Sequence, residues 1–173
     1  DLKFRTNVGA DISNGVYEFY VDPIRTVYGR QNHGISNLAK WEYMSLLNEN
    51  TLTYSKFFGH HSLTALLGMS IQDNNYGHGY INTKDVPDAP VKTTNAGNQI
   101  EGAGNTKTTS AIVSQFGRVM YDYDTKYLIT AAIRRDGSSN LAAGNKWDVF
   151  PSFSAGWRIS QESFFSNMDF IND

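Results

Sequence analysis

The sequence predicts an all-β protein, in the form of an antiparallel transmembrane β-barrel segment of about six strands. Apolar and polar residues alternate with a period of two over long stretches, and long connections alternate with short ones. Aromatic residues make up 13% of the chain and only four prolines interrupt it, which favours strands. The clearest alternation runs for about twelve residues, enough for a membrane crossing of roughly 9 to 11 residues and about twice the length of a soluble strand.

The first predicted strand covers residues 2–12. Its apolar set is Leu2, Phe4, Thr6, Val8, Ala10 and Ile12, and polar residues or glycine occupy the positions between them. The segment that follows, at about 22–40, is rich in Gly, Asn and polar residues. We expect this segment to form a loop.

A second strand is expected at 41–54, followed by a short turn at 55–60 and a third strand at 62–72. Residues 63–71 alternate cleanly, so the two strands should form a hairpin with one apolar face. Residues 73–108 carry many Asn, Gly, Thr and Asp, two prolines and little apolar periodicity. They predict a second long loop.

The fourth strand is expected at 109–123, where Gln115 and Phe116 fall on the wrong faces of the alternation. A tight turn at 124–126 leads to a fifth strand at 127–135. A loop at 136–148 and a sixth strand at 149–160 complete the chain.

Connection lengths and faces together favour a membrane barrel. Such barrels have short periplasmic turns, long extracellular loops, a polar interior and an apolar outer band. Arg118, Asp122 and Arg158 are expected to face a water-filled lumen, while the alternate residues face lipid. The aromatic residues expected to form an interfacial girdle near the strand ends are Tyr54, Phe57, Phe58, Tyr121, Tyr123, Tyr127 and Trp157.

Composition argues against several other functions. The net charge is −2 and no block of like charge is present, so the sequence does not indicate binding to nucleic acid. The absence of cysteine excludes disulfides, thiolate metal sites and cysteine nucleophiles. No stretch of 18 apolar residues is present. The segment at 102–109 lacks the glycine that a phosphate loop needs before its lysine, and adjacent His60 and His61 diverge in an extended chain. We therefore expect no enzyme activity, no cofactor and no metal.

Several segments resemble barrel segments of the SusC/RagA family of TonB-dependent outer-membrane transporters. The resembling segments are LKFRTNVGADI, ENTLTYSKFFGHHSLTALLGMSIQ, FGRVMYDYDTKYLITAAIRRDGSS and FPSFSAGWRISQESFF. The most specific motif residues are Arg134, Arg135, Asp136, Gly137, Ser138, Phe150, Pro151, Ser152, Ala155, Gly156, Trp157 and Arg158. The similarity covers nearly the whole chain except the expected long loops, with Met120 standing where the family usually has a polar residue.

The resemblance implies a barrel of 22 strands with an N-terminal plug. Residues 1–173 are then expected to be part of a single receptor barrel domain, with the plug absent from this chain. The implied function is import of oligosaccharides or peptides across the outer membrane of a Gram-negative, Bacteroidetes-type bacterium. The implied partners are a SusD-like surface lipoprotein, the TonB complex through the missing N-terminal region, and outer-membrane lipid. Two alternatives stay open: a complete small barrel with an adhesive or structural role, and a soluble carbohydrate-binding β-sandwich.

The motif residues are expected to be mainly structural. Arg134 and Arg135 are expected to pair with Asp136 and neighbouring carboxylates, and Gly137 to provide a turn, although Arg134 could instead touch a polar substrate in the lumen. Four aromatic residues assigned to loops are candidate contacts for a ligand or a partner. These are Tyr28, Tyr76, Tyr80 and Trp147.

Overall fold

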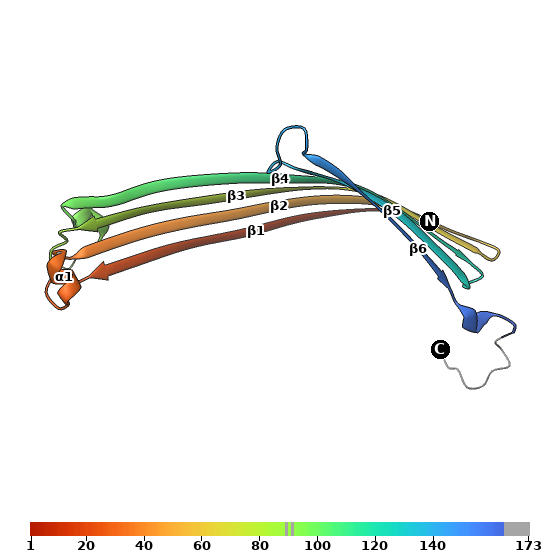
Figure 1. The fold of residues 1–173 in the computed structure, drawn as a ribbon, viewed down its shortest axis with the longest axis horizontal. Helices are drawn as coiled ribbons and strands as arrows, with labels where there is room; N and C mark the ends of the chain where they lie inside the picture. Colours follow the sequence, from red (N-terminus) through yellow and green to blue (C-terminus); the bar gives the residue numbers. More distant parts are fainter. Residues whose placement is uncertain (89, 91, 165–173) are drawn as a thin grey trace. The chain divides into compact units, whose positions relative to one another are not determined.

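The six predicted strands form a single sheet. The computed structural model describes residues 1–88, 90 and 92–164. The strands are β1 (Leu2–Val21), β2 (Ile35–Phe58), β3 (His61–Lys84), β4 (Gln99–Tyr123), β5 (Tyr127–Ser138) and β6 (Trp147–Trp157). They lie beside one another in chain order, from β1 to β6 (Figure 1). The predicted all-β fold with six strands is confirmed.

Three short helical segments lie in or after the connections. They are α1 (Val27–Gln31) between β1 and β2, the 3-10 helix η1 (Thr94–Ala96) between β3 and β4, and the 3-10 helix η2 (Ile159–Gln161) after β6. None of the helices in the described part of the chain is long and apolar enough to cross a membrane.

The chain divides into two compact units. The first contains residues 1–9, 47–72 and 111–173, and the second contains residues 10–46 and 73–110. The first unit therefore holds the hairpin turn between β2 and β3, the turn between β4 and β5, and the whole of β5 and β6. The second unit holds the long connections that leave β1 and β3.

In the first unit, tight turns join long strands. Only residues 59 and 60 separate β2 from β3, and only residues 124–126 separate β4 from β5. Gly59, Asp124 and Thr125 have φ angles of 60°, 54° and 56°, the left-handed backbone that such sharp reversals require. The longer connections span 22–34, 85–98 and 139–146, so the predicted alternation of long and short connections is confirmed.

Strand pairing gives β4, β5 and β6 two chemically distinct faces. The strands are antiparallel, with Phe116 opposite Arg134 and Arg134 opposite Phe150. Because side chains alternate between faces, even-numbered residues share one face and odd-numbered residues share the other. The polar face carries Ser114, Arg118, Asp122, Thr130, Arg134, Asp136, Asp148, Ser152 and Ser154. The apolar face carries Val113, Val119, Ile129, Ala131, Ile133, Val149, Phe153 and Ala155.

In the second unit, the strands are much longer than the sequence predicted. The expected loop at 73–108 is wrong, because β3 continues to Lys84 and β4 begins at Gln99, which leaves a connection of 85–98. Here polar side chains stabilise the sheet by pairing across strands. The Tyr43 hydroxyl donates to Asn74 Oδ1 at 3.3 Å, and Lys84 Nζ lies 2.9 Å from Glu101 Oε1. Because polar side chains occupy both faces of these strands, the sequence shows no apolar periodicity there and did not predict them.

The tightest packing of the second unit lies where the first residues of β2 and the last residues of β3 meet the connection after β3. Thr83 of β3 and Val86 of the connection that follows are almost fully buried, and the Thr83 hydroxyl donates to the carbonyl oxygen of Ser36 on β2 at 3.0 Å. The Ser36 hydroxyl donates in turn to the Lys92 carbonyl oxygen at 3.2 Å. Among the described residues, Ile35 and Val86 are the buried hydrophobic ones. The apolar face of the sheet is therefore not covered by the rest of the described chain.

Candidate functional site

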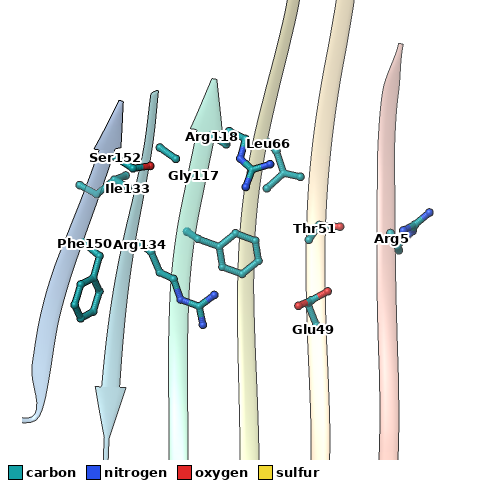
Figure 2. Close-up of a pocket in the computed structure, with 12 residues that line it drawn as sticks. Arg5, Glu49, Thr51, Leu66, Gly117, Arg118, Ile133, Arg134, Phe150 and Ser152 are labelled. Atoms are coloured by element: carbon teal, nitrogen blue, oxygen red, sulfur yellow. The ribbon is translucent and has the colours of Figure 1, made fainter. Parts of the chain in front are cut away.

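The candidate site is a groove on the polar face of the first unit. The groove has a volume of about 530 Å³ and is lined by residues from all six strands (Figure 2). Its charged and aromatic lining residues are Arg5, Glu49, Phe116, Arg118, Arg134 and Phe150. The wall is therefore polar with two aromatic side chains.

Arg134 is held in a fixed position in this groove. Its Nε donates to both carboxylate oxygens of Asp136, at 2.8 and 2.9 Å, and its Nη2 donates to the Ser114 hydroxyl at 3.0 Å. The guanidinium lies 5.8 Å from the centroid of the Phe116 ring, and Ser114 is only 1% exposed. The expected pair of Arg134 with Asp136 is present, and the other guanidinium N–H groups stay available to the groove.

Arg135 has a different environment, and the expectation that it pairs with a carboxylate is wrong. It lies on the apolar face, where its guanidinium stands 4.3 Å from the centroid of the Trp147 ring. The ion pairs of the described residues do not include it. Consecutive residues of a strand point to opposite faces, so two neighbouring arginines cannot share one carboxylate easily.

Gly137 does not form the expected turn. It lies within β5 opposite Trp147, and a Cβ atom built on it would stand 2.8 Å from the indole ring. Glycine is needed at this position because the Trp147 ring covers it. The structural reason is close packing across strands rather than an unusual backbone angle.

The other motif residues lie along β5 and β6 or just beyond β6. Ser138 is the last residue of β5, and Pro151 and Gly156 lie within β6 opposite Ile133 and Leu128. The expected position of Arg158 in a strand facing the lumen is wrong, because β6 ends at Trp157. The Arg158 backbone N–H instead donates to the Lys126 carbonyl oxygen at 2.8 Å, and the residue caps η2.

Aromatic residues gather near the tight turns, as the predicted girdle requires. The Tyr123 and Tyr127 rings stack at 6.3 Å between centroids, and the Tyr127 and Trp157 rings stack at 6.4 Å. His61 extends this row, since its ring lies 4.9 Å from that of Tyr123 and 5.1 Å from that of Phe58. His61 Nδ1 also lies 2.6 Å from the Tyr121 hydroxyl oxygen.

A polar cluster closes this row of rings. Glu162 accepts hydrogen bonds from the Tyr127 hydroxyl at 2.5 Å and from Trp157 Nε1 at 3.2 Å. These bonds, with the nearby Lys126 ammonium, hold the pKa of Glu162 below its ordinary value. In the adjacent turn, a hydrogen bond with His60, at 2.9 Å, is the main cause that lowers the pKa of Asp124. Both carboxylates are therefore stabilised in their charged form.

Of the four aromatic residues predicted to contact a ligand from loops, only Tyr28 lies in a connection. It belongs to α1 and is 59% exposed. The loop assignment of the others is wrong, because Tyr76 and Tyr80 lie in β3 and Trp147 is the first residue of β6. Tyr76 lines a separate cavity of about 320 Å³ in the second unit, and the Tyr80 ring covers Gly104 of β4.

The sequence reasoning missed most of the groove. It assigned Arg118 to the polar face but did not connect Arg5 or Phe150 with it. The signal was present for Arg5, which alternates with the apolar set of the first strand. Phe150 gave no such signal, because an aromatic residue on a polar face contradicts the alternation.

Comparisons with known proteins place the chain in a family. No family model matches it. It is 40% identical over 175 residues to TonB-dependent receptor P39 of Formosa agariphila. This alignment covers 99% of the present chain and 17% of that receptor. It is 27% identical over 180 residues to TonB-dependent receptor SusC of Bacteroides thetaiotaomicron, covering 100% of this chain and 17% of SusC.

The fold agrees with these relatives. A solved structure of the RagAB peptide transporter superposes with a TM-score of 0.86 over 94% of this chain and 18% of that one, at 20% identity. The chain thus spans less than a fifth of the length of the proteins that it matches. It belongs to the SusC/RagA family of TonB-dependent receptors, and its six strands are a segment of their β-barrel.

Proposed function

We propose that the chain forms part of the wall of an outer-membrane transporter that imports oligosaccharides or peptides. The observation that carries the proposal is the division of one sheet into an apolar face and a polar face that bears a groove. A transport barrel needs both, since one face meets lipid and the other lines a water-filled passage.

The energetics of the sheet support a place in a larger barrel. On the apolar face, Val119, Ile133 and Phe153 are 46%, 55% and 72% exposed. Lipid covers such a surface in an outer-membrane barrel, while neighbouring strands satisfy the backbone groups at both edges of the sheet. All of residues 1–173 would then belong to one barrel domain, with the plug elsewhere in the receptor.

Membership of the family supports a proposal about the partners and the location. We propose that the TonB complex energises import through an N-terminal region outside this chain, and that a SusD-like lipoprotein covers the extracellular side. The membrane is the outer membrane of a Bacteroidetes-type bacterium. The relatives are named receptors and transporters rather than enzymes, and we propose transport without catalysis.

The two alternatives receive less support. A soluble carbohydrate-binding sandwich buries one sheet against another, whereas the described residues form one sheet. A complete small barrel closes its first strand against its last, whereas the described strands follow the open order β1 to β6.

Deletion of the receptor gene in the source bacterium tests the function. We expect the deletion strain to lose growth on one class of oligosaccharide or peptide and to keep growth on the corresponding monomers. The full-length receptor restores growth and co-purifies with a surface lipoprotein. Equal growth of both strains on every oligomer, or a receptor found in the soluble fraction, would falsify the proposal.

A further inference from the structure

Four titratable side chains form a charged row beside the tight turns of the first unit. His60 Nδ1 lies 2.9 Å from Asp124 Oδ1, and Lys126 Nζ lies 3.5 Å from Asp124 Oδ2 and 3.6 Å from Glu162 Oε2. The two carboxylates therefore alternate with the imidazole and the ammonium group. The charged row connects the turn after β2, the turn after β4 and the segment that follows β6.

The charged row lies next to the aromatic residues at the end of the apolar face. Tyr123 pairs with Tyr127, and Tyr127 pairs with Trp157, so these three rings share the face of the odd-numbered residues. Glu162 Oε1 accepts hydrogen bonds from the Tyr127 hydroxyl and from Trp157 Nε1. In a membrane barrel, rings of this kind lie at the level of the lipid headgroups. The charged row is then at the same level.

The charges within the row are not fully compensated. Lys126 Nζ is the cation that the described ion pairs give to Asp124 Oδ2 and Glu162 Oε2, and both distances exceed the 2.7–2.9 Å or so of a charge-assisted hydrogen bond. The pKa values of both carboxyls lie below their ordinary values, so both are charged at neutral pH. Two carboxylates thus share one ammonium group, which leaves one negative charge in excess when the imidazole is neutral.

We propose that the charged row binds the headgroup of a zwitterionic phospholipid with a primary ammonium group, the chemistry of phosphatidylethanolamine. The lipid ammonium donates to Asp124 Oδ2 and Glu162 Oε2, and the lipid phosphate accepts from the Lys126 ammonium. Glu162 is fixed by its bonds to the two rings before the lipid arrives, so little side-chain freedom is lost on binding. This inference rests on the proposed membrane location and adds a lipid partner to it.

Charge and hydrogen bonding favour this headgroup over two common alternatives. Its ammonium balances the excess negative charge, and its phosphate meets a cation. The quaternary ammonium of phosphatidylcholine has no N–H group to donate. Phosphatidylglycerol brings a negative charge without an ammonium, and like charges beside the two carboxylates are unfavourable. Tyr127 and Trp157 are 43% and 52% exposed, so their rings are open to the apolar part of the same lipid.

Native mass spectrometry of the purified full-length receptor in detergent tests the inference. The probes are phosphatidylethanolamine, phosphatidylcholine and phosphatidylglycerol with identical acyl chains, in the presence of a chelator that keeps divalent cations off the carboxylates. We expect phosphatidylethanolamine to bind most tightly. Glu162→Gln should lower its preference over phosphatidylcholine about threefold, as the loss of a partly exposed ion pair does. The glutamine keeps an oxygen that can accept from Tyr127 and Trp157.

Asp124→Asn is the second variant, and we expect it to lower the preference by a similar factor. Asp148→Asn is the matched control, because it makes the same change at the opposite end of β6 from Trp157. We expect it to keep the preference of the unmodified receptor. Equal binding of phosphatidylethanolamine and phosphatidylcholine, tightest binding of phosphatidylglycerol, or equal losses in Glu162→Gln and Asp148→Asn would each overturn the inference.

Hydrogen exchange in lipid vesicles locates the binding. We expect residues 122–127 to exchange more slowly in vesicles of phosphatidylethanolamine and phosphatidylcholine than in vesicles of phosphatidylcholine alone, and Glu162→Gln to reduce this difference. The same exchange in both vesicles would overturn the inference, because the headgroup would then not reach the turn.

The outcome is separable from that of the proposed function. A deletion strain that imports normally, combined with a lipid preference that depends on Glu162, would reject the transport function while keeping the lipid site. A deletion strain that loses import, combined with lipid binding that is insensitive to Glu162→Gln and Asp124→Asn, would reject the lipid site while keeping the transport function.

Discussion

Arg134 and Arg135 are consecutive in the chain, yet they belong to two regions with opposite chemistry. Arg134 lies on the polar face with Asp136, Ser114 and the groove, and Arg135 lies on the apolar face against Trp147. Residue type is identical, so the difference comes from strand parity alone. A position in this sheet therefore has to be interpreted by its face before its residue type.

The aromatic side chains are also divided between the two faces of the sheet. On the polar face, Phe116 lies over Gly68 of β3, so an aromatic ring forms the floor of the groove. On the apolar face, the rings gather near the turns, where Glu162 accepts their polar hydrogens. Aromatic side chains thus line the groove on one face and gather beside the tight turns on the other.

The largest expected effect comes from a charge on the apolar face. Val119 and Met120 are consecutive on β4 and lie on opposite faces. We expect Val119→Lys to destabilise the folded receptor by about 2–4 kcal/mol, because the ammonium group must enter lipid. Met120→Lys should have a much smaller effect, since its face meets water. Urea unfolding of the full-length receptor in lipid vesicles measures both free energies.

This comparison would break if the two lysine variants unfolded at the same urea concentration. Such a result would mean that the apolar face of β4 is covered by protein instead of lipid. A larger loss in Met120→Lys than in Val119→Lys would reverse the assignment of the two faces.

A smaller effect is expected from added volume beneath an aromatic ring. Gly137→Ala places a methyl group 2.8 Å from the Trp147 ring, so the ring must move. We expect a loss of about 1–3 kcal/mol, the usual result of overpacking. Gly156→Ala is the matched control, because its methyl group would lie 3.6 Å from Leu128 Cδ1, an ordinary contact.

Tryptophan fluorescence of the full-length receptor measures the response, together with the urea midpoint. A shift of the emission in Gly137→Ala that is absent in Gly156→Ala supports the packing role. Equal stability of the two variants would show that the ring moves without penalty.

Much of the first unit could be predicted from the sequence. Its strands alternate because one face is apolar, and the tight turn after Tyr123 was found from the short polar stretch DTK. The two exceptions to the alternation were also predicted correctly. The polar Gln115 lies on the apolar face and the apolar Phe116 lies on the polar face, as their positions in the sequence indicated. Periodicity identifies a strand where its two sides meet different solvents.

The second unit was predicted poorly for a physical reason. Lys84 and Glu101 form an ion pair between two strands that the sequence predicted as a loop. Polar residues on both sides of a strand give no alternation, although backbone hydrogen bonds form all the same. The groove was missed in a related way, because the contact between Arg134 and Phe116 depends on register rather than on sequence spacing.

A third prediction concerns Asp124 and Glu162, the two carboxylates beside the turn between β4 and β5. The pKa values of Asp124 and Glu162 lie below their ordinary values of 3.8 and 4.5, so both carboxylates stabilise the turns above about pH 4. This contribution is lost as the pH falls through the lowered values. We expect hydrogen exchange of residues 122–127, corrected for its intrinsic pH dependence, to accelerate below pH 4 while that of residues 149–155 does not.

The variants Asp124→Asn and Glu162→Gln supply the controls for this pH effect. Neither side chain titrates, so in the double variant exchange in the turn should depend much less on pH. Full protection of residues 122–127 at pH 3 in the unmodified receptor would show that the charged forms contribute nothing.

The smallest expected effect comes from removing the Arg135 side chain that lies against Trp147. Arg135→Ala removes the stacking of a guanidinium on Trp147, which is worth about 0.5–1 kcal/mol at an exposed site. We expect a loss of that size in the urea free energy, together with a change in Trp147 emission. Trp147→Leu should remove the effect of Arg135→Ala, because a double-mutant cycle isolates the contact. An additive double variant would show that Arg135 acts through the membrane surface rather than through the ring.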